Sequence, residues 1–240
     1  MVDAHHALGD LGRAWELAGT AVADALTQDE PSVHIIAATC VMPPLSIVGE
    51  AQLARQLLAA ISDEALRQLP GPASEMWVAL AQMELRLQRP AEAACALERL
   101  DGAGGPSDER VRVRLAHTRC GLALALGNAE AALAALPADD ASGMNVELRT
   151  RGVAWRIEAE AMQGRVRAAT MARARAMLAA PSEHAQATLE LHAALARAAR
   201  RGAPGVPAGA VDRHAVQVQT LAQTLSAHLA QRAAFEAAWH

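Results

Sequence analysis

The chain contains no lysine, because all 22 of its basic residues are arginine. The absence of lysine excludes phosphate-loop lysines, Schiff-base chemistry and lysine general bases. Aromatic residues are also scarce, with one phenylalanine, four tryptophans and no tyrosine in 240 residues. Strands favour aromatic and β-branched residues, whereas alanine, which is abundant here, is the best helix former. This composition predicts an all-α protein.

The sequence also lacks the short motifs that carry common chemistry. It has no Gly-x-Ser-x-Gly, no His-Glu-x-x-His, no Cys-x-x-Cys and no phosphate-cradling glycine loop. Cys40, Cys95 and Cys120 are odd in number and lie within apolar helical patterns, which is typical of buried, reduced thiols that act as small core residues. His184 and His192 are eight residues apart and only roughly on one helix face, so we expect no metal site from them. We therefore expect no catalytic residues, no metal and no cofactor.

Membrane and secretion signals are missing as well. No charged segment followed by an apolar segment opens the chain. The longest uncharged run, residues 31–49, contains two adjacent prolines and several polar residues, so it is predicted to be a helix followed by a loop. These features predict a cytoplasmic protein with no membrane contact.

Residues 76–100 contain the unit that the rest of the chain repeats. Met76, Leu80 and Met83 have the spacing of one apolar helix face, and Ala93 and Leu97 begin a second such stripe. Pro90 lies between the stripes, where it ends the first helix and can occupy the first turn of the second. The pattern predicts a helix hairpin, which needs similar neighbours to bury its apolar faces.

The turn of this hairpin recurs along the chain. A turn residue followed five positions later by alanine occurs at Gly9/Ala14, Gly49/Ala54, Gln88/Ala93, Gly127/Ala132 and Gly164/Ala169, and Gly202 continues the series. The first five turn residues are separated by 40, 39, 39 and 37 residues. Glycine suits a helix end because it adopts a left-handed conformation without steric cost, and alanine allows two helices to approach closely. A period of this size indicates a helical repeat array.

Residues of the best-defined unit resemble the signature of the tetratricopeptide repeat, namely Trp77, Leu80, Ala81, Ala93 and Leu97, followed by Pro106. Glu84 and Leu100 differ from it, since that family usually has an aromatic residue and alanine there, and the period exceeds the usual length of about 34 residues. The longer period is similar to the superhelical repeat arms of large bacterial signal-transducing ATPase transcription activators. Residues 225–239 resemble the end of such arms. The resemblance implies a scaffold or sensor role and carries over no catalytic residue.

The predicted fold is a right-handed α-solenoid of about five to six hairpins with a capping C-terminal helix, in one domain covering residues 1–240. An incomplete first repeat is expected at 1–27, full repeats at 32–61, 73–100, 107–136 and 146–179, and an atypical capping repeat at 183–239. Phe235 and Trp239 are expected to close the cap. Because the array begins half way through a repeat, we expect the chain to be the C-terminal arm of a larger regulator, with possible self-association through the open N-terminal edge.

Charge is distributed unevenly. Residues 1–109 carry 6 arginines and 16 acidic residues, whereas residues 110–240 carry 16 arginines and 10 acidic residues. An arginine stripe can attract nucleic acid, but the lack of stacking aromatics and the net charge of -4 argue against direct nucleic-acid binding. We interpret the stripe as a solvated helical face paired with Glu147, Glu158 and Glu160.

A concave groove is the predicted binding surface, and its partner is expected to be a protein, a peptide or a small inducer. The helical register assigns to it the residues Glu75, Val78, Gln82 and Arg86, together with Arg110, Arg114 and Arg156 from the arginine-rich helices. Two alternatives remain open at this point. The chain could be a purely structural spacer arm, or an enzyme built on a helical array, which would require a pocket with convergent titratable groups.

Overall fold

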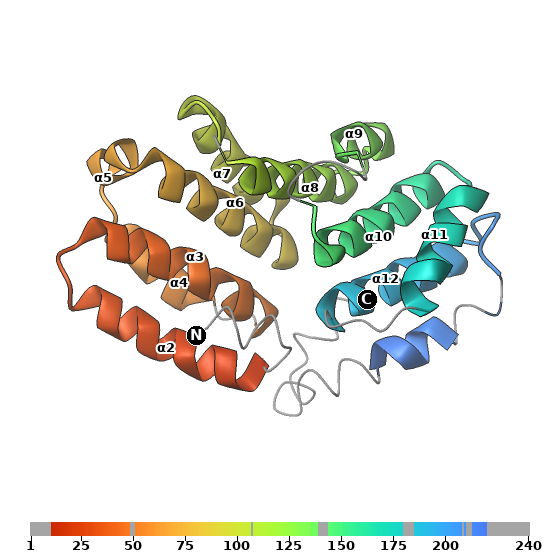
Figure 1. The fold of residues 1–240 in the computed structure, drawn as a ribbon, viewed down its shortest axis with the longest axis horizontal. Helices are drawn as coiled ribbons and strands as arrows, with labels where there is room; N and C mark the ends of the chain where they lie inside the picture. The colour runs from red at the N-terminus through yellow and green to blue at the C-terminus, as the bar shows by residue number, and fades with distance from the viewer. Residues whose placement is uncertain are drawn as a thin grey trace. The chain divides into compact units, whose positions relative to one another are not determined.

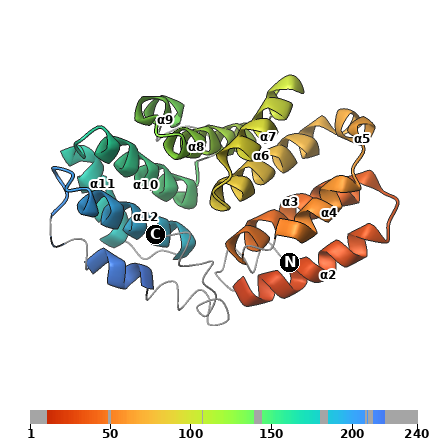
Figure 2. The ribbon, with the colours of Figure 1, turned by 180° about the vertical axis from the view of Figure 1, so that it is seen from behind.

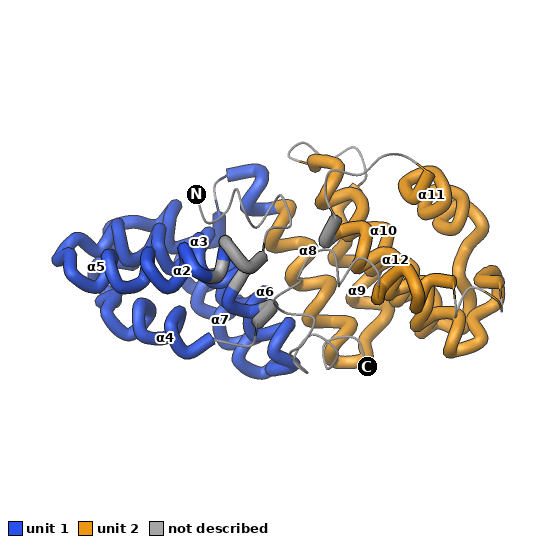
Figure 3. Tube along the Cα trace, turned by 90° about the horizontal axis from the view of Figure 1, so that it is seen from below, with its two compact units in different colours: residues 1–112, 226–240 blue, residues 113–225 orange. Residues whose placement is uncertain are grey.

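The computed structural model describes residues 11–48, 51–106, 108–138, 144–179, 185–207, 209 and 213–219. Across these ranges the regular structure is helical and contains no strand, so the predicted all-α class is confirmed for them. Within the same ranges, no helix combines the length and apolar character needed to cross a membrane. The chain divides into two compact units that meet between Arg112 and Val113 (Figure 3).

The first unit is built around a row of long helices. It contains α2 (Leu11–Leu26), α3 (Pro31–Val48), α4 (Ala51–Ala59), α5 (Asp63–Gln68), α6 (Pro70–Arg86), α7 (Pro90–Gly102) and the start of α8 (Glu109–Ala125). Helix α3 packs between α2 and α6, while α4 packs on α3 and α7 packs on α6 (Figures 1 and 2). The long helices α2, α3 and α6 therefore lie side by side, and the second helix of each hairpin forms another layer.

The second unit contains the rest of α8, then α9 (Ala129–Ala135), α10 (Val146–Met162), α11 (Ala168–Ala179), α12 (Ala185–Arg200) and a further helical segment at 213–219. Helix α10 packs against α9, α11 and α12. The main core of the second unit combines Ile157 of α10, Met171 of α11 and Leu191 and Leu195 of α12. A smaller cluster of Cys120, Ala132 and Ala159 joins α8, α9 and α10.

Left-handed turn residues follow the first helix of four hairpins. Their φ angles are 57° at Gln88, 75° at Gly127, 88° at Gly164 and 64° at Gly202. At each of them the next residue donates a backbone hydrogen bond to the carbonyl five residues earlier, as Arg89 does to Glu84 at 2.8 Å. This is the Schellman arrangement, which satisfies carbonyls at a helix end. Four of the predicted turns are thus present, while Gly9 and Gly49 lie outside the described residues.

The small residue five positions after the turn behaves as predicted in most hairpins. Ala14, Ala54, Ala93 and Ala132 are fully buried. Ala169 is exposed, which corrects the prediction at that position, and Thr170 is buried in its place. The reason is that α11 begins four residues after Gly164, whereas α7 and α9 begin two residues after their turn residues, so the longer loop shifts the buried face of α11.

A buried glutamate lies four residues before the turn residue in two hairpins. Glu84, which stands where the repeat family usually has an aromatic residue, accepts hydrogen bonds from Arg55 of α4 at 3.0 and 3.2 Å and lies 3.9 Å from the Arg89 guanidinium. Glu160 accepts a hydrogen bond from the Arg167 backbone amide at 2.9 Å and another from the Thr170 hydroxyl at 3.0 Å. In both cases hydrogen bonds offset the cost of burying a carboxylate.

Helix α3 differs from its predicted length. The pair Pro43-Pro44 was expected to fall in a loop, yet α3 continues to Val48. Proline removes a backbone donor from a helix interior, and α3 nevertheless continues through both prolines. The Ser46 hydroxyl donates to the Pro43 carbonyl at 2.6 Å. The predicted cap residues Phe235 and Trp239, and the N-terminal edge at residues 1–10, lie outside the described residues.

Replacing Ala93 by leucine tests the close approach of α6 and α7. Because Ala93 is fully buried, the extra side-chain volume of Ala93→Leu is expected to lower the free energy of unfolding by about 1–3 kcal/mol. Ala91→Leu adds the same volume to an exposed site on the same helix and should leave the urea midpoint nearly unchanged. Equal midpoints for the two variants would contradict the assigned packing.

Candidate functional site

Polar and charged side chains that are buried or partly buried come together in the second unit on helices α8, α10 and α12. The local origin of this arrangement is the start of α10, where the Asn145 side chain caps the helix by accepting a hydrogen bond from the Leu148 amide at 2.8 Å. This cap fixes the helical register, and residues four apart then share a face. Glu147 and Arg151 consequently lie together on α10. We call Glu147, Arg151, Glu190 and His117 the Arg151 cluster.

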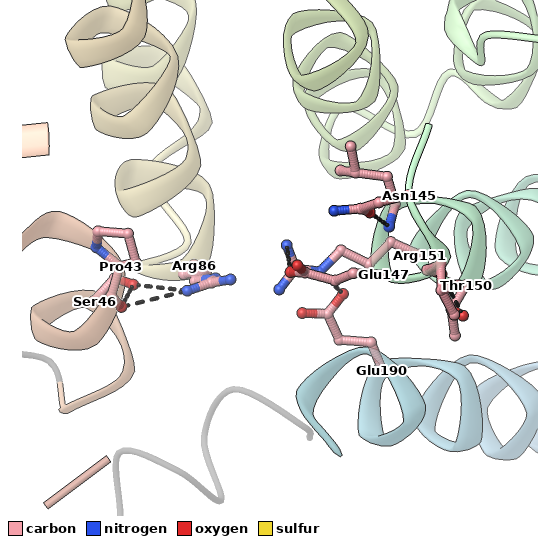
Figure 4. Close-up of polar contacts among 10 residues, drawn as sticks. Pro43, Ser46, Arg86, Asn145, Glu147, Thr150, Arg151 and Glu190 are labelled. Atoms are coloured by element: carbon pink, nitrogen blue, oxygen red, sulfur yellow. Dashed lines mark hydrogen bonds and ion pairs between the residues drawn. The ribbon is translucent and has the colours of Figure 1, made fainter. Parts of the chain in front are cut away.

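Arg151 holds two carboxylates (Figure 4). Its Nη1 atom lies 2.9 Å from Glu147 Oε1, and its Nε atom lies 3.0 Å from Glu190 Oε2 on α12. The side chain of Arg151 is 13% exposed, against 30% for Glu147 and 17% for Glu190. Burial alone would lower the pKa of Arg151, but Glu190 and then Glu147 outweigh burial and raise that pKa. The guanidinium is therefore permanently charged and bridges two helices.

Part of the guanidinium has no hydrogen-bond acceptor among the described residues. The Nη2 atom of Arg151 is buried without a hydrogen-bond partner, whereas the neighbouring Nε atom is ion-paired with Glu190 Oε2 at 3.0 Å. These two nitrogens form one edge of the planar guanidinium fork, the geometry that recognises two acceptor positions at once. Buried polar atoms without partners are uncommon in folded proteins and require an explanation.

His117 on α8 is the second residue whose buried side-chain nitrogens lack a hydrogen-bond partner among the described residues. Its side chain is almost fully buried, at 1% exposure for the residue, and within the described ranges neither ring nitrogen has a hydrogen-bond partner. Its ring meets Trp155 edge to face at 5.3 Å between centroids. Gly152 leaves room for the His117 ring against α10, since a Cβ atom at position 152 would lie only 3.1 Å from His117 Nε2.

The ring of His117 is neutral at physiological pH. Burial is the main cause that lowers its pKa, to about 4, and the positive charge of Arg151 lowers it further. A neutral imidazole carries one donor and one acceptor. In the part of the chain that the structure describes, the buried side-chain nitrogens without hydrogen-bond partners all belong to His117 and Arg151. These atoms mark the strongest candidate site.

The four groove residues predicted on α6 have different environments. Val78 is fully buried, so it contributes to packing instead of presenting a side chain to a ligand. Glu75, Gln82 and Arg86 are half-buried. Arg86 Nη1 donates to the Ser46 hydroxyl at 3.1 Å and to the Pro43 carbonyl at 3.4 Å, and thereby ties α6 to α3 (Figure 4).

The remaining predicted groove residues lie on α8 and α10. Arg110 is exposed near the start of α8 and belongs to the first unit, whereas Arg114 and Arg156 are half-buried in the second unit. Arg156 lies near Cys120, a buried thiol whose pKa is raised to about 12, chiefly by burial. The positive charge of Arg156 partly opposes that rise. Cys120 is therefore a protonated core residue, as predicted from the sequence. The same prediction is wrong for Cys95, which is exposed because α7 buries the face formed by Ala93, Ala96, Leu97 and Leu100, and Cys40 is only half-buried.

The arginine stripe is paired with acidic residues and is mostly exposed, as predicted, but a few of its members are partly buried. The exposed arginines are Arg110, Arg112, Arg119, Arg149, Arg165, Arg167, Arg173 and Arg175, and the half-buried ones are Arg114, Arg151 and Arg156. Arg197 pairs with Glu158, Arg151 pairs with Glu147, and Arg167 Nε lies 3.5 Å from Glu160. The pairing with Glu147, Glu158 and Glu160 agrees with the sequence interpretation. Glu160 is nevertheless buried and Arg151 nearly so, because α10 packs against three other helices. The interpretation of the stripe as a solvated surface is corrected for these residues.

The sequence analysis did not single out the Arg151 cluster. The i,i+4 spacing of Glu147 and Arg151 was visible, but only the packing of α10 against α12 brings Glu190 to the same guanidinium. Among the described residues, no group of three or more His, Cys, Asp or Glu side chains is placed to hold a metal ion. No protein-family model, curated protein or solved structure matches this chain.

Proposed function

We propose that this protein is a non-catalytic, tetratricopeptide-like repeat module that binds a protein, a peptide or a small inducer. In this proposal the helix pairs α3–α4, α6–α7, α8–α9 and α10–α11 are repeats of a right-handed α-solenoid of about five to six hairpins. The recurrent left-handed turns and the side-by-side packing of α2, α3 and α6 support it. The ligand-binding face is formed by the first helices of the hairpins, which carry the Arg151 cluster.

The observation that carries this proposal is the Nη2 atom of Arg151, which is buried without a hydrogen-bond partner among the described residues. A ligand carbonyl that accepts a hydrogen bond from Nη2 of Arg151 would satisfy a buried donor that otherwise costs free energy. The neighbouring carboxylates of Glu147 and Glu190 favour a donor or a cation beside that carbonyl. With one positive and two negative charges, the cluster disfavours a free carboxylate ligand. An amide group, as in a peptide backbone, supplies a carbonyl and an N–H donor together.

The charge state of His117 favours binding over catalysis. A general base works best when its pKa is near the operating pH, whereas the pKa of His117 is lowered to about 4. The imidazole is consequently a weak base that serves as a neutral hydrogen-bonding group. An enzyme on a helical array and a purely structural spacer arm are the alternatives, and the second predicts no ligand at the Arg151 cluster.

The cellular role follows from the resemblance noted in the sequence. We propose that the chain is the C-terminal arm of a larger bacterial transcription regulator, acting in the cytoplasm, where the free thiols of Cys40, Cys95 and Cys120 remain reduced. Direct nucleic-acid binding is not part of this role. Several arginines of the basic half are occupied by carboxylates, including Arg112, Arg151 and Arg197.

A thermal-shift experiment with small amides tests the proposed site. The compounds are N-acetylated dipeptide amides and acetamide, with acetate as the anionic comparison. A ligand at 100 times its dissociation constant stabilises the folded state by about 2.7 kcal/mol, which is measurable as a rise in melting temperature. We expect at least one dipeptide amide to raise the melting temperature and acetate to have no effect.

Two variants test whether the rise in melting temperature comes from binding at the Arg151 cluster. Arg151→Lys keeps the positive charge between the carboxylates but removes the planar fork, so it should abolish the shift. Arg67→Met, at an exposed i,i+3 pair with Glu64 in the first unit, should keep the wild-type shift. A shift that persists in Arg151→Lys, or the absence of any shift with the dipeptide amides, would contradict the proposal.

A further inference from the structure

Two histidines from different segments of the second unit meet directly. His192 lies on α12, and His214 lies in the helical segment 213–219. Their Nδ1 atoms are 2.7 Å apart, their ring centroids are 5.0 Å apart, and the ring planes are tilted by 42°. The sequence spacing of His184 and His192 predicts no metal site. His184 lies outside the described residues, and the partner that the structure gives His192 is His214.

Both imidazoles are in the form that coordinates metals. Burial is the main cause that lowers the pKa of His192, to about 4, and the neighbouring His214 lowers it further. Burial also lowers the pKa of His214, with a smaller effect from the adjacent Arg213 charge. Two neutral rings can share only one hydrogen between the facing Nδ1 atoms, so one of these atoms presents a lone pair to the other. Neutral imidazole is also the metal-binding form of histidine.

We propose that His192 and His214 bind one divalent transition-metal ion, with Zn²⁺ as the reference, through their Nδ1 atoms. This inference is independent of the proposed function. On binding, the hydrogen between the rings moves to the Nε2 atom of the same histidine, both rings stay neutral, and each Nδ1 donates its lone pair to the metal. Two zinc–nitrogen bonds of about 2.0–2.1 Å at a tetrahedral angle require a nitrogen–nitrogen distance of about 3.3 Å. To reach it, the rings need to separate by a fraction of an ångström and to rotate so that both Nδ1 lone pairs point at the same ion.

The surroundings define the class of metal. No third His, Cys, Asp or Glu in the described residues completes a cluster with this pair, so water fills the remaining coordination positions. The charge of Arg213 opposes any cation, and no carboxylate of the described residues joins the two histidines, which disfavours Mg²⁺ and Ca²⁺ because these ions prefer oxygen ligands. Zn²⁺, Cu²⁺ and Ni²⁺ form strong bonds to imidazole nitrogen and can offset this repulsion. The bound ion would link α12 to the 213–219 helix.

Isothermal titration of the full chain with ZnCl₂ tests the site. Cys95 is exposed and could bind zinc adventitiously, so the titration uses a Cys95→Ser background. We expect one zinc ion per chain, and binding at least tenfold weaker in His192→Ala and in His214→Ala. MgCl₂ should produce no binding heat. His34→Gln, which removes a histidine of the first unit, should bind zinc as the background protein does.

A second measurement distinguishes loss of zinc binding from loss of folding in the variants. The circular dichroism spectrum and melting temperature of each variant without metal establish that it is folded. Zinc should raise the melting temperature of the background protein and not that of His192→Ala or His214→Ala. The inference is overturned if the background protein binds no zinc at the pair, or if either alanine variant binds zinc with unchanged affinity.

Discussion

Acidification from pH 6.5 to pH 4 is expected to remove about 3 kcal/mol of folding stability through His117 alone. The pKa of this buried imidazole is about 4 in the folded protein, compared with an ordinary value of 6.5. The unfolded chain therefore binds a proton first as the pH falls, which stabilises the unfolded state. The shift of about 2.5 units corresponds to about 3.4 kcal/mol at 1.36 kcal/mol per unit. This contribution is complete above pH 6.5 and is lost progressively towards pH 4.

His192 and His214 act in the same direction, because the pKa of each is also lowered. Both rings are only partly buried, and solvent screening makes their contributions smaller. Urea unfolding at pH 7.5, 6.5, 5.5 and 4.5 measures the combined effect as a falling midpoint.

The variant His117→Leu isolates the contribution of the buried ring. It removes two nitrogens that lack partners among the described residues, so its stability at pH 7.5 should equal or exceed that of the wild-type protein. At pH 4.5 the variant should be more stable by about 2–3 kcal/mol, because no buried imidazole is then protonated. Parallel pH profiles for the two proteins would show that His117 is not buried as described.

Arg151→Met is expected to lower the free energy of unfolding by about 3 kcal/mol. Removing one partner of a buried ion pair leaves uncompensated charge, which typically costs about 3–5 kcal/mol. The lower end applies here because Glu147 and Glu190 remain 30% and 17% exposed and can recover some hydration. Urea unfolding at pH 7.5 measures the loss, and Arg67→Met, at a fully exposed pair, should leave the midpoint unchanged.

A combined variant separates the lost charge pairing from lost packing. The triple variant Arg151→Met, Glu147→Gln, Glu190→Gln carries no charge at any of these three positions. It should therefore recover much of the stability that Arg151→Met alone loses. If the triple variant is less stable than Arg151→Met, the arginine contributes mainly by packing its aliphatic stem, and the electrostatic account is wrong.

Local sequence signals predicted the helices and several of their ends. The hairpin turns at Gln88, Gly127 and Gly164 were predicted from spacing alone, because each helix end depends on a single residue with a left-handed backbone. The burial of Ala93 and Ala132 followed from the same register. The exposure of Ala169 could not be predicted from this register. The loop after Gly164 is two residues longer than its counterparts, and the spacing of the glycines contains no information on loop length.

The candidate site was harder to predict because its parts come from three helices. A helical projection of α10 places Arg151 beside Glu147, but it contains no information on Glu190, which follows 39 residues later on α12. The His117 ring packs closely against Gly152, a glycine inside a helix that the periodic pattern did not distinguish. Contacts between helices, unlike helix ends, are determined by packing across the whole unit.

The two buried glutamates determine how far a local opening of the fold can spread. Glu160 is bonded entirely within its own hairpin, to Arg167 and Thr170. Glu84 is bonded to Arg55 of the preceding hairpin. Unfolding of α4 would therefore remove the partner of the buried Glu84 carboxylate and expose its charge. Opening of the α3–α4 hairpin is thereby coupled to α6–α7, whereas the Glu160 bonds make no such link for α10–α11. In a repeat array this difference sets the size of the cooperative folding unit, hairpin by hairpin.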